Sequence, residues 1–440
     1  MTLRFGTDGV RGVANVDLTP ELVLALGRAA ARVLPGNRYL IGRDTRRSGP
    51  MLASALAAGL ASEGVAVERL GVVPTPAVAW LSATEDVPAA MISASHNPFG
   101  DNGIKLFTAG GRKLPDDVEE ELEAELDRLL HGAVTVAGDV GVVEERDDVL
   151  SRYAEHLRAS VGSLAGMRVV LDCANGAASS VAPEVLRAAG AEVDVLFAAP
   201  DGVNINAGGG STHRGALQRR VVELGADAGL ALDGDADRVL AVDHRGRLID
   251  GDHIIAICTI DRAGRGALRD NSVVVTVMTN LGFRLAMQER GITVVETAVG
   301  DRYVLEALAE RNLSIGGEQS GHVIFPDLAT TGDGTLTSLQ LLDVLHRSGR
   351  PLAELADEAM TQLPQVLENV RVGRAAAELV DAVADDVAAV EAELGAHGRV
   401  LLRPSGTEPL VRVMVEAPTA EQARAAADRL VAAVERASAA

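Results

Sequence analysis

One pattern recurs three times along this 440-residue chain and constrains its fold more than any other feature. Short apolar runs rich in β-branched residues alternate with helical stretches, a pattern typical of parallel strands joined by helices. The runs cover residues 39–41, 65–67 and 89–92, then 169–171, 193–196 and 229–232, and finally 273–275, 292–295 and 313–315. The sequence therefore predicts three similar α/β units.

Composition and the C-terminal pattern complete the predicted architecture. Apolar residues make up 47% of the chain but aromatic residues only 2%, so Ala, Val and Leu must build the cores. Beyond about residue 362 the pattern changes to a helix at 375–394, strands at 399–403 and 411–415, and an Ala-rich terminal helix. We predict three similar α/β domains with mixed sheets and a smaller C-terminal α+β domain around a central cleft. The expected boundaries are 1–148, 149–249, 250–364 and 365–440.

In each α/β unit the third strand runs into a polar loop. These loops cover residues 93–98, 233–238 and 317–322. Ligands of open α/β sheets bind at the carboxyl ends of the strands. Three equivalent loops from three similar units are therefore expected to converge on one cleft.

The second of these loops has the pattern of a metal site. Asp233, Asp235 and Asp237 alternate, so in an extended chain their side chains share one face. Three carboxylates would repel one another unless a cation lay among them, and oxygen ligands suit Mg²⁺ or Ca²⁺. An EF-hand is excluded because Arg238 and His244 occupy the positions that need Gly and Glu. A solvated acidic loop is the alternative, although an apolar strand leads directly into this one.

The first loop offers a candidate nucleophile. Ser95 could accept a phosphoryl group if a metal neutralised the developing charge. The surrounding sequence is not a Gly-x-Ser-x-Gly elbow, which disfavours a serine hydrolase. Lys105 is one of only two lysines, with Lys113, and a lysine can release a proton whereas an arginine effectively cannot. An ordinary loop histidine at His96 and a surface lysine at 105 remain the alternatives.

The net charge of −21 is expected to repel nucleic acid and anionic lipid, so an anionic substrate needs a local cationic pocket. Residues 403–408 supply one candidate, because backbone N–H groups around Gly406, two hydroxyls and nearby arginines can form an anion-binding nest. A plain β-turn is the alternative there. The sequence contains no Gly-x₄-Gly-Lys-Ser/Thr loop, so nucleotide binding of that kind is unsupported.

The chain is expected to work in a reduced, cytoplasmic compartment. Cys173 and Cys258 lie far apart in apolar runs, which indicates buried free thiols. We expect no signal peptide and no membrane span, since no charge-free apolar run reaches about 18 residues. The sequence leaves a homodimer open as the oligomeric state.

Five segments together resemble the α-D-phosphohexomutase superfamily. They are Thr-Asp-Gly-Val-Arg-Gly at 7–12, the loops at 93–98, 233–238 and 317–322, and Arg-Pro-Ser-Gly-Thr-Glu at 403–408. They occur in the family's order, and the resemblance runs from end to end of the chain. Gln319 and residues 299–303 resemble the branch that acts on glucosamine phosphate, with the mannose and glucose phosphate branches as the alternatives.

The resemblance implies a role for each loop. The metal ligands would be Ser95, Asp233, Asp235 and Asp237. Beside the transferring group would lie Arg11, His96 and Lys105, with Lys105 as the preferred general acid/base. Arg238 would flank the loop of the aspartates, and Glu318 and Ser320 would bind sugar hydroxyls with His322 nearby. The phosphate that is not reacting would be bound by Arg403, Ser405, Gly406, Thr407 and Arg412.

The implied reaction interconverts glucosamine 6-phosphate and glucosamine 1-phosphate. A phosphorylated Ser95 and a sugar 1,6-bisphosphate would be intermediates, Mg²⁺ the cofactor, and added sugar bisphosphate an activator. The product would be an amino-sugar precursor for UDP-N-acetylglucosamine and cell wall synthesis. A metal-dependent phosphatase and a non-catalytic sugar-phosphate-binding protein are the rivals, and a second phosphate loop and the retention of Ser95 argue against them.

Overall fold

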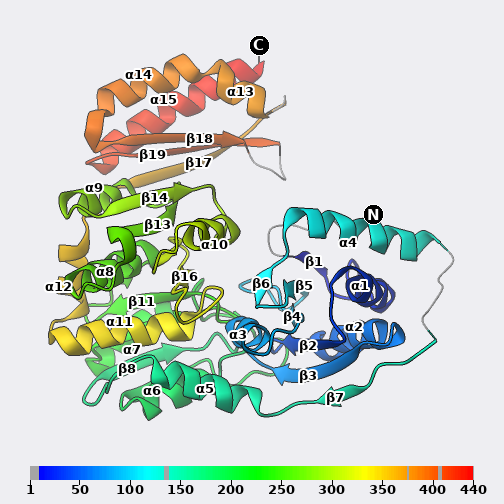
Figure 1. The fold of residues 1–440 in the computed structure, drawn as a ribbon. Coiled ribbons are helices and arrows are strands. Elements are labelled where there is room, and N and C mark those ends of the chain that lie inside the picture. Colours follow the sequence, from blue (N-terminus) through cyan, green and yellow to red (C-terminus); the bar gives the residue numbers. More distant parts are fainter. Residues whose placement is uncertain (1–8, 133–137, 374–375, 405–408, 440) are drawn as a thin grey trace. The chain divides into compact units, whose positions relative to one another are not determined.

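The computed structural model describes residues 9–132, 138–373, 376–404 and 409–439. Within them the chain forms four sheets (Figure 1). The chain divides by its contacts into two compact units, residues 1–278 with 292–358 and residues 279–291 with 359–440. Three sheets belong to the first unit and the fourth to the second. This confirms the expectation of three α/β sheets followed by a small α+β domain, while the individual domain boundaries stay a prediction.

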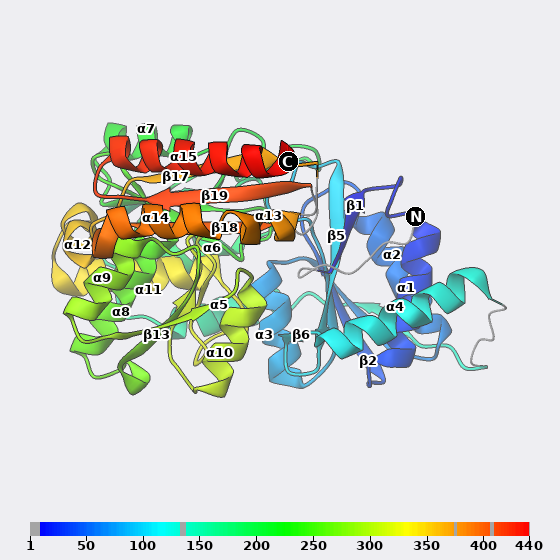
Figure 2. The same ribbon diagram turned by 90° about the horizontal axis from the view of Figure 1, so that it is seen from above.

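The first sheet carries the strand that leads to Ser95. Its order is β1 (Val10–Val13), β5 (Asp101–Thr108), β4 (Ala89–Ile92), β2 (Arg38–Arg43), β3 (Ala66–Val72) and β7 (Val143–Glu145), with β6 (Arg112–Lys113) beside β5. The pairs among β4, β2, β3 and β7 are parallel, whereas β5 is antiparallel to its neighbours, so the sheet is mixed. Its helices are α1 (Pro20–Val33), α2 (Gly49–Ser62), α3 (Thr75–Glu85) and α4 (Asp116–His131). In Figure 2, α3 lies on one side of this sheet and α1, α2 and α4 on the other.

Helices α1 and α2 pack closely together because small residues lie between them. A Cβ on Gly27 of α1 would lie 2.4 Å from the carbonyl oxygen of Leu56 in α2, so this contact requires glycine. Helix α1 begins at a Pro, and the hydroxyl of Thr19 accepts a hydrogen bond from the N–H of Leu22. The Ala and Leu residues of α1 and α2 therefore form tightly packed helices.

The second sheet has the order β12 (Leu248–Ile249), β11 (Val239–Asp243), β10 (Ala228–Leu232), β8 (Arg168–Asp172) and β9 (Glu192–Leu196). Strands β10 and β11 are buried throughout, as expected for strands covered on both faces. The helices of this region are α5 (Val149–Ala159), α6 (Val181–Ala188) and α7 (Gly215–Leu224).

The third sheet has the order β14 (Thr293–Thr297), β13 (Ser272–Thr276), β15 (Gly316–Gly317) and β16 (Val323–Ile324). The predicted strand at 313–315 is displaced: Leu313 and Ile315 are buried, but regular pairing begins only at Gly316. The remaining helices of the first unit are α8 (Gly251–Gly264), α10 (Asp301–Glu310), α11 (Gly334–Ser348) and α12 (Leu352–Ala359), whose last residue falls in the second unit.

The second unit is built on an antiparallel sheet of β17 (Gln365–Arg371), β19 (Leu410–Glu416) and β18 (Arg399–Pro404). The helices of this unit are α9 (Leu281–Glu289), α13 (Ala376–Ala382), α14 (Ala384–Leu394) and α15 (Ala420–Ala439). Helix α9 joins the unit through the buried carboxylate of Glu416, which accepts hydrogen bonds from the N–H of Leu281 at 2.9 Å and from Arg399. Strand β17 was missed by the sequence pattern, and the predicted helix at 375–394 is broken at Val383.

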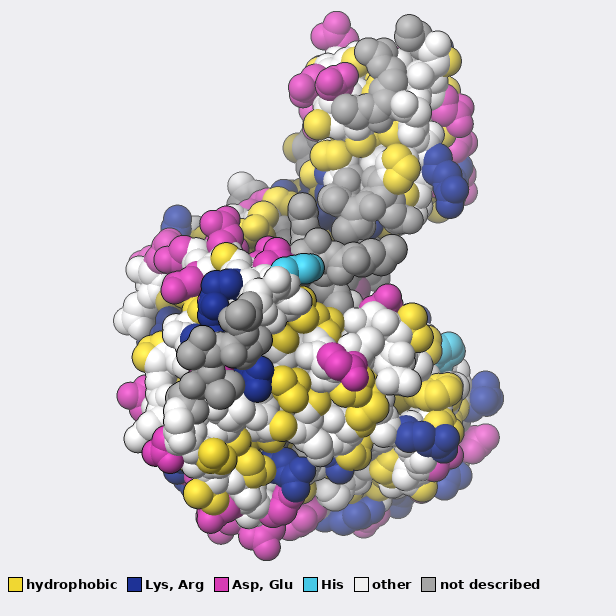
Figure 3. Space-filling model, turned by 90° about the vertical axis from the view of Figure 1, so that its right-hand side faces the viewer, with side chains coloured by type: hydrophobic (Ala, Val, Ile, Leu, Met, Phe, Trp, Pro, Cys, Tyr) yellow, Lys and Arg dark blue, Asp and Glu magenta, His cyan; other side chains and the backbone are white. Residues whose placement is uncertain are grey.

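Two further features concern the charges on the surface and the hydropathy of the helices. On the face shown in Figure 3, acidic and basic side chains are interspersed. Within the part of the chain that the structure describes, no helix is both long and apolar enough to cross a membrane.

An ion-pair cluster around Glu85 is expected to stabilise the first unit against acid. Arg38, Arg146 and Arg152 all donate to its carboxylate at 2.6–2.9 Å, and the hydrogen bonds from Arg146 lower the pKa of Glu85 to about 2. Because this pKa lies below the unfolded value of 4.5, the stabilisation is present above pH 4.5 and is lost as the pH falls towards 2. Glu85→Gln should lower the free energy of unfolding at neutral pH by about 1–3 kcal/mol.

Urea unfolding across this pH range is the measurement, with the exposed Glu144→Gln as the matched control. The stability difference between Glu85→Gln and the unsubstituted protein should shrink as the pH falls below 4.5. A stability difference that does not change with pH would show that the ion pairs of Glu85 are not its source.

Candidate active site

The structure brings two of the predicted loops into direct contact. Ser95 follows β4 and Asp233 follows β10, so both lie at the carboxyl ends of strands. The Ser95 hydroxyl donates a hydrogen bond to the carboxylate of Asp233 at 2.6 Å, and both side chains are buried. A candidate nucleophile and a candidate metal ligand, 138 residues apart in the chain, therefore share one site.

The three aspartates of the second loop form a group that fits a divalent cation. One carboxylate oxygen from each of Asp233, Asp235 and Asp237 lies within 4.8 Å of the others, and all three residues are buried. Among the described residues, Oδ1 of Asp235 is buried without a hydrogen-bond partner, so it has spare capacity as a ligand. The pKa of Asp233 is raised well above its usual range, first by burial and then by repulsion from Asp237 and Asp235. Such a site holds unfavourable negative charge that a hard cation would relieve.

Lys105 supplies a positive charge to the same group. It lies in β5, directly opposite Met91 of β4, and its side chain is only 4% exposed. Its ammonium group donates to Asp235 at 2.9 Å and to Asp237 at 3.3 Å. The predicted general acid/base is therefore held against two of the predicted metal ligands.

His96 lies beside Ser95, and two arginines act on its ring. Nδ1 of His96 lies 3.4 Å from the Ser95 hydroxyl and accepts a hydrogen bond from Arg238 at 3.3 Å, which places the proton of the neutral ring on Nε2. The pKa of His96 is lowered, first by burial and then by the charges of Arg238 and Arg11. The site therefore presents a neutral imidazole with two cations beside it, as an incoming phosphate would require.

The third loop also reaches the aspartates. His322 is buried, its Nε2 accepts a hydrogen bond from the N–H of Gly332 at 3.0 Å, and its Nδ1 lies 3.7 Å from Asp237. Glu318 accepts from the N–H of Gly300 at 3.2 Å, and burial raises its pKa. All three predicted loops of the first unit thus supply groups to one region.

Ser320 and Gln319 of this loop have surroundings different from those of Glu318 and His322. Ser320 is exposed. The side-chain amide of Gln319 donates instead to Asp250 at 3.3 Å, at the start of α8. Gln319 therefore holds the loop against the start of α8.

The predicted phosphate-binding residues lie in the second unit, and only two of them are described. Arg403 of β18 and Arg412 of β19 stand directly opposite each other in the antiparallel register. The pKa of Arg403 is lowered, first by burial and then by the charge of Arg412. Two neighbouring arginines are a suitable pair for an anion. The remaining predicted residues, Ser405, Gly406 and Thr407, lie outside the described residues.

The loop at 233–238, here called the metal loop, is supported by hydrogen bonds from two neighbouring helices, and these supporting residues were not predicted from the sequence. Thr75 begins α3; its N–H donates to the carbonyl oxygen of Asp235 at 3.0 Å and its hydroxyl to the carboxylate at 2.7 Å. The N–H of Gly334, which begins α11, donates to the carbonyl oxygen of Ala236 at 2.9 Å. Two helix N-termini therefore face this acidic loop and favour its negative charge. The sequence marks Thr75 only as a helix start between two prolines, which carries no sign of a partner 160 residues away.

Thr75→Val should weaken metal binding and leave the fold intact. The substitution removes the hydroxyl that orients Asp235 but keeps the shape of the side chain, and the loss of such a supporting hydrogen bond typically costs about 10–100-fold in metal affinity. Calorimetric titration with Mg²⁺ measures the change. Thr84→Val, at an exposed site on the same helix, is the control. An unchanged affinity in Thr75→Val would show that the hydroxyl has no part in metal binding.

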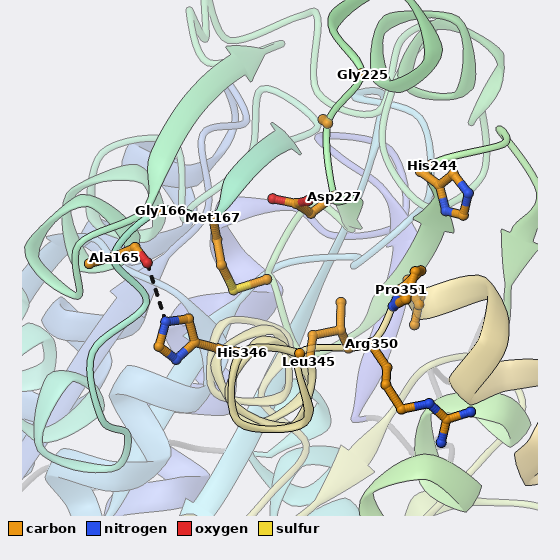
Figure 4. A pocket seen from close by; sticks show the side chains of 13 residues that line it. Ala165, Gly166, Met167, Gly225, Asp227, His244, Leu345, His346, Arg350 and Pro351 are labelled. Atoms are coloured by element: carbon orange, nitrogen blue, oxygen red, sulfur yellow. Dashed lines mark hydrogen bonds between the residues drawn. The ribbon is translucent and has the colours of Figure 1, made fainter.

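A cavity of about 510 Å³ lies at the opposite end of the second sheet (Figure 4). Met167 and Asp227 line it just before β8 and β10 begin, and His346 donates to the carbonyl oxygen of Ala165 at 3.2 Å. Because these residues lie at the amino ends of the strands, this cavity is separate from the metal loop, which lies at the carboxyl ends.

Comparison with known proteins agrees with this arrangement. Models of the phosphoglucomutase/phosphomannomutase family match residues 2–131 (alpha/beta/alpha domain I), 151–246 (domain II), 250–363 (domain III) and 367–433 (C-terminal domain). Proteins named phosphoglucosamine mutase are similar over nearly the whole chain. That of Frankia alni is 56% identical and covers 99% of this chain and 98% of its own length. That of Thermobifida fusca is 55% identical, with 98% and 97% covered.

Solved structures share the fold. A phosphoglucomutase/phosphomannomutase family protein from Burkholderia thailandensis superposes with a TM-score of 0.85 at 24% identity, covering 99% of this chain and 98% of that one. N-acetylphosphoglucosamine mutase of Aspergillus fumigatus, solved with GlcNAc-6P and magnesium, superposes with a TM-score of 0.69 at 19% identity, covering 100% and 96%. The chain therefore belongs to the phosphoglucosamine mutases of the phosphoglucomutase/phosphomannomutase family.

Proposed function

We propose that this protein is an isomerase that interconverts glucosamine 6-phosphate and glucosamine 1-phosphate through a phosphorylated Ser95. The observation that carries the proposal is the hydrogen bond from Ser95 to Asp233 within the buried aspartate group, beside Lys105 and His96. Relatives about 55% identical over the whole chain carry the corresponding name, which supports the choice of sugar.

Asp233, Asp235 and Asp237, together with a phosphate oxygen on Ser95, would hold Mg²⁺. The buried oxygen ligands and the raised pKa of Asp233 suit this ion. When bound, Mg²⁺ would neutralise the charge that develops on the transferring phosphoryl group.

The reaction consists of two transfers in opposite directions. In the first, the bond between Ser95 Oγ and phosphorus breaks, and the 1-hydroxyl of the sugar forms a bond to that phosphorus. The hydroxyl loses its proton and Ser95 Oγ gains one, so a serine and a 1,6-bisphosphate result. After the bisphosphate turns over, its 6-phosphate returns to Ser95. We assign Lys105 to carry the proton, because its ammonium group is buried against Asp235 and Asp237 of the metal loop.

The substrate would be held at both ends. Glu318, Ser320 and His322 would bind sugar hydroxyls, while Arg11 and Arg238 would face the reacting phosphate. The other phosphate would lie with Arg403, Ser405, Gly406, Thr407 and Arg412. A sugar 1,6-bisphosphate would prime Ser95, and the product would feed UDP-N-acetylglucosamine and cell wall synthesis in the cytoplasm.

Trapping the phosphoenzyme tests this function. The protein is incubated with glucose 1,6-bisphosphate and Mg²⁺, and its peptides are analysed by mass spectrometry. Phosphate should appear on Ser95 and should leave again when glucosamine 6-phosphate is added, with glucosamine 1,6-bisphosphate as the product. Release of inorganic phosphate alone would point to the phosphatase alternative and would overturn the mutase proposal.

A further inference from the structure

Arg46 is a fully buried arginine for which the proposed reaction has no role. It lies in the loop after β2, where its Nε donates to the carboxylate of Asp44 at 2.8 Å. Nη2 donates to the carbonyl oxygens of Ser95 at 3.0 Å and Asn97 at 2.9 Å, and Nη1 donates to those of Pro98 and Asp101. A guanidinium has five N–H donors. Here one binds Asp44 and the other four bind backbone carbonyl groups between Ser95 and the first residue of β5.

Asn206 approaches the same loop from the second α/β sheet region. Its side-chain amide donates to the carbonyl oxygen of Ser95 at 2.9 Å and to that of Asn97 at 3.0 Å. These are two of the four carbonyl oxygens that Arg46 also binds. The loop is therefore clamped between a guanidinium from its own domain and an amide that lies 111 residues further along the chain.

The clamp acts on a strained residue. Ser95 has a φ of 50°, in the left-handed region that L residues other than glycine adopt only at a cost. Ser93 reinforces this conformation, because its hydroxyl accepts from the N–H of Ser95 at 3.0 Å and donates to Asp44 at 2.7 Å. With its carbonyl oxygen held by Arg46 and Asn206, Ser95 places its hydroxyl against Asp233.

The backbone of the metal loop packs against the same carbonyl group. A Cβ on Gly234 would lie 2.5 Å from the carbonyl oxygen of Ser95, so the two loops approach as closely as glycine permits. A shift of the Ser95 carbonyl group would therefore change the position of its hydroxyl relative to the aspartates.

We propose that Arg46 and Asn206 are positioning residues that set the rate of phosphoryl transfer to and from Ser95. This inference rests on the proposed function, since it concerns the same nucleophile. Neither residue contacts the sugar loop at 317–322 in the interactions described above. Their loss should therefore slow transfer and leave sugar binding nearly unchanged, and a misplacement of about 1 Å can cost about 10²-fold in rate.

Asn206→Asp is the sharpest test, because it keeps the shape of the side chain but turns carboxylate oxygens towards two carbonyl oxygens. We expect about a 10²-fold fall in kcat, a KM for glucosamine 6-phosphate within about threefold of the unsubstituted value, and an equally slowed phosphorylation of Ser95 by glucose 1,6-bisphosphate. Asn204→Asp is the matched control. Asn204 is half-buried on the same loop, where its amide donates to Ala199 and its side-chain oxygen accepts from the N–H of Asp201, which Asp can still do, so this variant should keep the kcat and KM of the unsubstituted protein.

Arg46→Lys is the second variant. It keeps the positive charge beside Asp44 but cannot make the four backbone contacts, so it should show the same split between kcat and KM. If it does not fold, Asn206→Asp decides alone. Unchanged Ser95 phosphorylation in Asn206→Asp, or a raised KM with unchanged kcat, would overturn the inference while the mutase assignment stands. No Ser95 phosphorylation in the unsubstituted protein would instead overturn the proposed function.

Discussion

Ser95→Ala is expected to reduce mutase turnover by at least about 10³-fold, because the variant lacks the oxygen that would carry the phosphoryl group. The fold should survive. The Ser95 hydroxyl donates to Asp233, and that carboxylate still accepts from the N–H of Arg238 at 3.2 Å. Initial rates of glucosamine 1-phosphate formation, measured alongside a thermal unfolding curve, separate the two effects.

Ser54→Ala is the matched control, since Ser54 is an exposed serine on α2 of the same domain. Binding of glucosamine 6-phosphate, followed by calorimetry, should be nearly the same in Ser95→Ala and in the control. Appreciable turnover by Ser95→Ala would remove Ser95 from the nucleophile role.

Asp233→Asn is expected to move activity and stability in opposite directions. Without metal at neutral pH, the variant should be more stable than the unsubstituted protein, because one buried carboxylate that repels Asp235 and Asp237 is gone. The asparagine can still accept from Arg238 and can donate to Ser95. Turnover should nevertheless fall by at least about 10³-fold, because one predicted metal ligand has lost its charge.

The response to Mg²⁺ separates this explanation from a general loss of structure. In the unsubstituted protein, Mg²⁺ at about 100 times its Kd should add about 2.7 kcal/mol to the free energy of unfolding. This gain should be much smaller in Asp233→Asn and should be retained in the control Asp147→Asn, at an exposed carboxylate. Equal stabilisation of all three proteins by Mg²⁺ would place the metal elsewhere.

Local patterns were sufficient to predict most of the fold. Buried strands such as β10 appear in the sequence as uninterrupted apolar runs, and the loop that follows such a strand must lie at the edge of the sheet. This is why the loops of Ser95 and Asp233 could be assigned to one cleft. Strand β17 was not predicted because polar and charged residues interrupt its apolar residues, and only Val370 in it is buried.

The supporting residues of the site could not be predicted, because their partners lie far away in the chain. Thr75, Arg46 and Asn206 act on groups 160, 49 and 111 residues away. Nothing in the local sequence marks such a contact, which exists only once the chain has folded. The orientation of Gln319 towards Asp250 is a similar case, since the sequence shows that the residue is present but not which way it points.

A ³¹P NMR time course would show directly which sugar phosphate this protein isomerises. The purified protein, Mg²⁺ and a trace of glucose 1,6-bisphosphate are mixed separately with the 6-phosphates of glucosamine, glucose and mannose. Glucosamine 6-phosphate should be converted fastest, with its 1-phosphate as the product and no accumulation of inorganic phosphate. Faster conversion of the glucose or mannose ester would contradict the sugar assignment, and free phosphate as the sole product would contradict the mutase itself.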